Sequence, residues 1–249
     1  MTTASPTLAT DLSAGGRLGP THGLLAIQSV VVILVSLNRL GPWTLGYVAP
    51  NEFLRWVDFN NMLLLPLIST VAFYLLKKRI EYASPALNGR GHLALNLTFI
   101  VGLYLLAASY GDHEVTNYLH TRFCLDDEVS ALCRIVIFND DEFSHWVFFA
   151  GFVMMNAALM LLQVIFPFVG RTTKGDFALL IVNGLFIGLG VFANLAFEVI
   201  GLDLYVVALL AALSIFLVWR RGPQPLLVYY SVAYVLGLVA TFIYKAMPS

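Results

Sequence analysis

Seven long apolar segments constrain the fold of this chain more than any other feature. A helix needs about 20 mostly apolar residues to cross the hydrocarbon core of a bilayer. Segments near that length lie at residues 22–38, 62–76, 92–110, 144–169, 177–200, 204–219 and 225–246. The second and sixth are shorter, so we expect each to include flanking residues or to tilt less. The sequence therefore predicts an all-α polytopic membrane bundle of about seven transmembrane helices.

The shortage of charged residues supports this prediction. They make up 12% of the 249 residues, against about 25% in soluble domains, and the mean hydropathy is +0.81. This composition argues against a soluble enzyme, a disordered chain and a nucleic-acid-binding domain. We therefore expect membrane lipid, and no nucleic acid, among the partners; the sequence does not predict the oligomeric state.

The chain divides into a short tail and one domain. Residues 1–20 are polar and small and contain glycine and proline, which predicts a flexible cytoplasmic tail. A cleaved signal peptide is not expected, because the first apolar segment begins late and lacks an A-x-A-like site. Residues 21–249 form the predicted seven-helix transmembrane domain, with an acidic outer loop at 111–143.

Charged residues are distributed unequally between the two ends of the segments. Basic residues in short loops mark the cytoplasmic face, and nine of the 14 fall on one side: Arg17, Lys77, Lys78, Arg79, Arg90, Arg171, Lys174, Arg220 and Arg221. Most acidic residues, and Trp43, Trp56 and Trp146, fall on the other. We predict a multi-pass protein of the cell membrane with its amino terminus in the cytoplasm, its carboxyl terminus outside and its active face extracytoplasmic.

The segment 110–146 contains the residue types that bind metal ions. His113 and His120 are seven residues apart, so on a helix they face the same way. Glu142 and His145 form a Glu-x-x-His pair, a spacing that places both ligands on one helical turn. We predict a divalent-metal site made by these four residues, with zinc favoured and iron or manganese as alternatives. The alternative is that this segment forms a folded, solvated acidic cap that binds no metal.

Three carboxylates are candidates for catalysis. Glu114 and Asp141 lie beside the predicted ligands, where a carboxylate can move a proton. Glu198 lies about one turn inside the outer end of the fifth segment, and a carboxylate at that depth faces protein or a water cavity. It shares a helical face with Asn183 and Asn194, and Gly184 and Gly188 form a close-packing pattern nearby. A structural hydrogen bond is the alternative role for Glu198.

Two further features belong to the predicted outer face. Residues 39–61 are aromatic and interrupted by prolines, which predicts a segment lying in the membrane interface. It would act as a lid, a lateral entrance for lipid or a simple connector. Cys124 and Cys133 lie in the outer loop, and we expect them to form a disulfide if that compartment is oxidising.

Three functions remain compatible with these patterns. The favoured one is an integral membrane enzyme with a divalent metal at the outer face that acts on a lipid or amphiphile, with hydrolysis favoured over oxidation. The second is an ion-coupled transporter or carrier that uses Glu198. The third is a non-catalytic sensor of pH or metal, or an assembly factor, because histidines near acids titrate around pH 5–7.

Overall fold

The computed structural model describes residues 17–82, 89–197 and 201–247, and this part of the chain is helical and contains no strand. The α-helices are α2 (Gly19–Leu40), α3 (Trp56–Phe59), α4 (Leu65–Tyr82), α5 (Arg90–Leu119), α6 (Ala131–Phe138), α7 (Ser144–Ile165), α8 (Lys174–Phe197), α9 (Leu202–Arg221) and α10 (Pro225–Ala246). The short turns are the 3-10 turn η1 (Pro42–Thr44) and the π-helical turns η2 (Asn60–Leu64), η3 (His120–Cys124) and η4 (Asn139–Phe143).

Within the described residues, seven helices are long and apolar enough to cross a membrane. Three of them are composite, because a π-helical turn continues an α-helix without a break. They run from Trp56 to Tyr82, from Arg90 to Cys124 and from Ala131 to Ile165. The predicted all-α bundle of seven membrane-length helices is therefore confirmed. The side on which each terminus lies stays a prediction.

Two predicted boundaries differ from the structure. The segment 111–143 is not a loop: α5 continues to Leu119, η3, α6 and η4 follow, and only the stretch 125–130 between η3 and α6 is non-helical. Its acidic residues are compatible with helix, and it contains neither proline nor any glycine after Gly111. The first turn of α2 also includes residues 19 and 20, assigned above to the tail, because proline is well tolerated at the start of a helix. Residues 1–16 lie outside the described residues.

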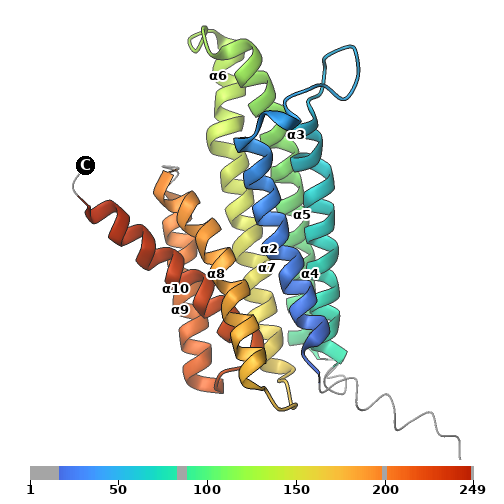
Figure 1. The fold of residues 1–249 in the computed structure, drawn as a ribbon, viewed down its shortest axis with the longest axis vertical. Coiled ribbons are helices and arrows are strands. Elements are labelled where there is room, and N and C mark those ends of the chain that lie inside the picture. Colours follow the sequence, from blue (N-terminus) through green and yellow to red (C-terminus); the bar gives the residue numbers. More distant parts are fainter. Residues whose placement is uncertain (1–16, 83–88, 198–200, 248–249) are drawn as a thin grey trace, which may run out of the picture.

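The helices form two groups that pack side by side (Figure 1). Helices α2, α4, α5 and α7 make one group, and α8, α9 and α10 make the other. Contacts of α2 with α8 and of α7 with α9 join the groups. Figure 1 shows that α5 and the α6–α7 helix project beyond the other group at one end. We call this the α6 end, and the end that carries Arg17 and Tyr82 the opposite end.

The surface of the bundle is apolar, as expected for a protein surrounded by lipid. On α2, for example, Val30 and Leu37 are more than half exposed. Polar side chains instead pair inside the bundle. Ser29 of α2 donates a hydrogen bond to Asn183 of α8 at 2.9 Å. Such interhelical hydrogen bonds hold membrane helices together where no water can replace them.

Glycines set the closest helix crossings. A Cβ atom at Gly102 of α5 would lie 2.7 Å from the backbone nitrogen of Met155 in α7, and one at Gly151 would lie 2.7 Å from the carbonyl oxygen of Gly102. Gly184 and Gly188 of α8 approach the backbone of α10 in the same way, which agrees with the close-packing pattern noted in the sequence. The first crossing matters most here, because α5 and α7 carry the predicted site.

Candidate metal centre

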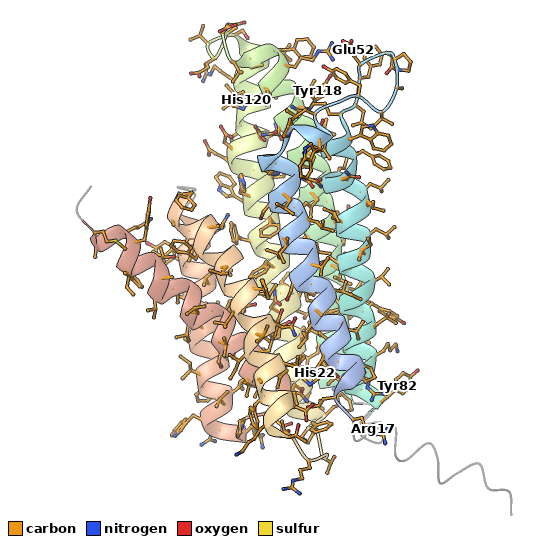
Figure 2. All side chains as sticks on the ribbon, viewed as in Figure 1. Arg17, His22, Glu52, Tyr82, Tyr118 and His120 are labelled. Atoms are coloured by element: carbon orange, nitrogen blue, oxygen red, sulfur yellow. A yellow bond between two sulfur atoms is a disulfide. The ribbon has the colours of Figure 1, made fainter. Side chains whose placement is uncertain are left out.

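The three π-helical turns gather at the α6 end, near the histidines of the predicted site. η3 continues α5 and begins with His120, whereas η4 joins α6 to α7 and contains Asp140 and Asp141. Figure 2 shows His120 and Tyr118 at this end, far from His22 and Arg17. π-helical turns often occur at functional sites, because they change which side chains share a helix face.

Asp140 is the centre of the cluster. It is 1% exposed. Nδ1 of His113 lies 3.0 Å from its Oδ1, and Nδ1 of His120 lies 2.9 Å from its Oδ2. Asn117, between these histidines on the same face of α5, donates to Oδ2 at 3.4 Å. The seven-residue spacing of His113 and His120 therefore does place both rings on one side of the helix.

Three residues are arranged to bind one ion. His120, Asp140 and Asp141 each offer a ligand atom, and these atoms lie within 4.8 Å of one another. Two ligand atoms about 2.0–2.2 Å from one tetrahedral zinc ion are about 3.3–3.6 Å apart, so the side chains need to move together by about 1 Å to complete the site. One imidazole and two carboxylates suit zinc, iron or manganese.

His145 joins this cluster from the first turn of α7. Its ring centroid lies 4.9 Å from that of His113, so the two predicted ligands from different helices do meet. Its Nδ1 lies 3.0 Å from the backbone carbonyl oxygen of Asp141. A carbonyl only accepts, so Nδ1 carries the proton and Nε2 is the basic nitrogen of the neutral ring.

Two other predicted residues lie outside the group of three. Glu142, which we predicted to be a ligand, is exposed on η4. Glu114, which we predicted to move protons, is 2% exposed and pairs with Arg39 of α2 at 2.5 Å. Glu198, on which the carrier hypothesis depends, lies outside the described residues.

Sequence reasoning missed Asp140. The run from Asp140 to Glu142 offers three successive carboxylates, and regular α-helical spacing favours Glu142, three residues before His145. In a π-helical turn the hydrogen bonds run between residues five apart, so the side chains of η4 share helix faces that regular α-helical spacing does not give. Only a predicted π-helical turn would have identified Asp140, and no sequence signal for such a turn was recognised.

The segment 39–61 reaches this end of the molecule. The part between α2 and α3 is fixed to α5 and η3 by Tyr118, which donates a hydrogen bond to the carbonyl oxygen of Glu52 at 2.7 Å. Arg122 of η3 donates to the same carbonyl and to the Tyr118 hydroxyl. Arg55 forms a two-point ion pair with Asp58, at 2.8 and 2.7 Å. The segment is thus attached to α5 and η3 through Tyr118 and Arg122, each of which is two residues from His120 in the chain.

A disulfide closes the tip of the α6 end. Cys124, the last residue of η3, is bonded to Cys133 in the first turn of α6, as the sequence predicted. Ser130 caps α6 by accepting a hydrogen bond from the backbone nitrogen of Cys133 at 3.2 Å. The disulfide therefore holds together the two helices that carry His120 and Asp140.

Comparisons with family models, with curated proteins and with solved structures find no match to this chain. The function must therefore be argued from the site itself.

Proposed function

We propose that this chain is an integral membrane metalloenzyme that binds a divalent ion, zinc in the first place, at His120, Asp140 and Asp141, and hydrolyses an amphiphilic substrate. One observation carries the proposal: these three ligand groups come from two helices and lie within 4.8 Å of one another. The central carboxylate is buried between His113 and His120, which lie 3.0 and 2.9 Å from its two oxygens. A charged carboxylate is tolerated at such a position when it is paired, as here, or when it binds a cation.

The number of ligands favours catalysis over a structural role. Structural zinc sites are closed by four protein ligands, whereas catalytic sites have three and leave a position for water or substrate. A bound zinc ion supplies a hydroxide near neutral pH by lowering the pKa of its water to about 7. Glu142, exposed and adjacent to Asp141 in the chain, would accept the released proton.

The depth of the site favours an amphiphilic substrate. At 1.5 Å per residue the helix from Arg90 to His113 is about 35 Å long, slightly more than the hydrocarbon core of about 30 Å. If Arg90 marks one boundary of the core, His113 lies at the level of the opposite headgroups. Trp146, next to His145, is 44% exposed, and tryptophan prefers this interfacial level.

Reconstituted protein tests this function. The purified chain is placed in liposomes that contain ester-, amide- and phosphoester-linked lipids, and the released products are measured by mass spectrometry. We expect hydrolysis of one class by the zinc-loaded protein. We expect loss of activity after dialysis against a chelator, and recovery on adding zinc. Asp140→Asn should reduce the rate by about 100-fold or more, because even residues that only orient ligands contribute 10–100-fold.

The matched control is Glu128→Gln, which removes an exposed carboxylate at the same end and should leave the rate unchanged. Turnover that survives both the chelator and Asp140→Asn would contradict metal-dependent catalysis. Zinc binding without turnover of any lipid class would contradict the enzymatic function and would favour the metal-sensor hypothesis instead.

A further inference from the structure

The cluster contains more ligand groups than one ion needs. Besides His120, Asp140 and Asp141, it includes His113 and His145, whose rings are in contact. We infer that the centre binds two divalent ions, with Asp140 as the carboxylate shared between them. The first ion is the one of the proposed function, on which this inference rests. The second is bound by His113 and His145.

The first argument is the position of the Asp140 carboxylate. Each of its oxygens faces a different histidine, Oδ1 facing His113 at 3.0 Å and Oδ2 facing His120 at 2.9 Å. Without a metal ion these contacts are ion pairs, and they place a different imidazole beside each oxygen of one carboxylate. A carboxylate with a histidine at each oxygen can be shared by two ions, and ions shared in this way lie about 3.5–4 Å apart.

The second argument is a pair of buried oxygens without hydrogen bonds. Oδ1 of Asp140 accepts none, because the better-aligned acceptor for Nδ1 of His113 is the backbone carbonyl oxygen of Asp140 at 3.3 Å. Oδ2 of Asp112, the residue before His113, is also buried without a hydrogen bond. A buried acceptor without a partner destabilises the folded protein. A cation bound beside His113 would satisfy such oxygens.

The third argument is the orientation of His145. Its Nδ1 donates to the carbonyl oxygen of Asp141, and metal-binding histidines commonly donate their second nitrogen to a carbonyl or carboxylate. In this tautomer Nε2 is the basic nitrogen, and it is the atom that would bind an ion. The hydrogen bond also connects the two sets of ligands, because Asp141 contributes its side chain to the first ion and its backbone to the orientation of His145.

Manganese titration of the full chain in detergent tests this inference. Electron paramagnetic resonance counts bound Mn²⁺ by loss of the free signal, and it distinguishes an isolated ion from a coupled pair. We expect the wild type to bind two equivalents and to give the signal of a coupled pair. His113→Ala and His145→Ala should each reduce binding to one uncoupled equivalent, and Asp140→Asn should weaken both sites.

His92→Ala is the matched control, since His92 lies at the beginning of α5 and pairs with Glu81 at the opposite end. It should still bind a coupled pair. One uncoupled equivalent in the wild type would overturn the second ion and leave the proposed function intact, whereas no bound metal would overturn both. A coupled pair that persists in His113→Ala and His145→Ala would also overturn the assignment. The wild-type spectrum decides the question even if a variant fails to fold.

Discussion

At the scale of single residues, the ion pair of Arg39 and Glu114 beside the candidate site joins two side chains that differ widely in exposure to solvent. Glu114 is 2% exposed, whereas Arg39 is 39% exposed and reaches water. Removing Arg39 leaves a buried carboxylate without its partner, which costs about 3–5 kcal/mol. Removing the charge of Glu114 leaves an arginine that water still solvates.

We therefore expect Arg39→Ala to lower the melting temperature of the detergent-solubilised protein by about 6–20 °C, at 2–4 °C per kcal/mol. Glu114→Gln should lower it by less than half as much. Intrinsic fluorescence during a thermal ramp measures both. Equal losses, or a larger loss for Glu114→Gln, would show that the pair is not the buried interaction described above.

The site residues show what sequence spacing captures at this scale. The seven-residue spacing of His113 and His120 is a property of one regular helix, so their common orientation could be predicted. Asp140 could not be predicted, because its position depends on a local π-helical turn. The pairing of Glu114 with Arg39 depends on the contact between α5 and α2, which no pattern in either segment encodes.

At the scale of helices, the crossing of α5 and α7 determines the geometry of the site. A Cβ atom at Gly151 would lie 2.7 Å from two backbone atoms of α5, one in Gly102 and one in Leu106. Backbone atoms cannot move aside as a side chain does, so the helices must separate. His113 and His120 of the α5–η3 helix would then move away from Asp140 and His145.

We expect Gly151→Ala to reduce divalent-metal affinity by about tenfold or more, the size of effect seen when the support of ligands is lost. Gly111→Ala is the control: it lies on α5, and nothing is within 4 Å of its added Cβ. Isothermal titration with zinc measures both variants. An unchanged affinity in Gly151→Ala would mean that the crossing does not determine the site.

The disulfide supports the same two helices from the tip. A disulfide that closes a loop of about ten residues contributes about 2–3 kcal/mol, and this one spans nine positions. We expect Cys124→Ser/Cys133→Ser to lower the melting temperature by about 4–12 °C and to weaken zinc binding. Treating the wild type with a reductant should reproduce both effects. A reductant that changes neither would contradict this role.

Much of the helix arrangement was predictable. Each of the seven apolar segments overlaps one membrane-length helix, because hydrophobic length is a strong signal. The helical segments that continue α5 and α7 into 111–143 were not, since charged residues are frequent there and apolar length no longer distinguishes helix from loop. Two of the three π-helical turns, η3 and η4, fall within these segments.

At the scale of the whole molecule, the orientation in the membrane remains to be tested. The α6 end carries most of the acidic residues and the proposed metal centre, and the opposite end carries Arg17, Lys78 and Arg79, with Glu81 and Asp176. Since lysine and arginine in short loops stay in the cytoplasm, we expect the α6 end to face outward.

Cysteine labelling in intact cells tests this orientation. Glu128→Cys at the α6 end should react with a membrane-impermeant maleimide, while Lys174→Cys at the start of α8 should react only after permeabilisation. The native cysteines are bonded to each other, so the wild type is the unlabelled control. The reverse pattern of labelling would place the metal centre on the cytoplasmic side.

The central claim is that this membrane bundle is a metalloprotein whose ion depends on Asp140. Elemental analysis of the protein, purified without chelator or His-tag, tests it most directly. The account predicts about one equivalent or more of zinc, iron or manganese per chain in the wild type and in Glu128→Gln, and a level near background in Asp140→Asn. A wild type without bound metal, or an Asp140→Asn variant that retains all of it, would contradict the account.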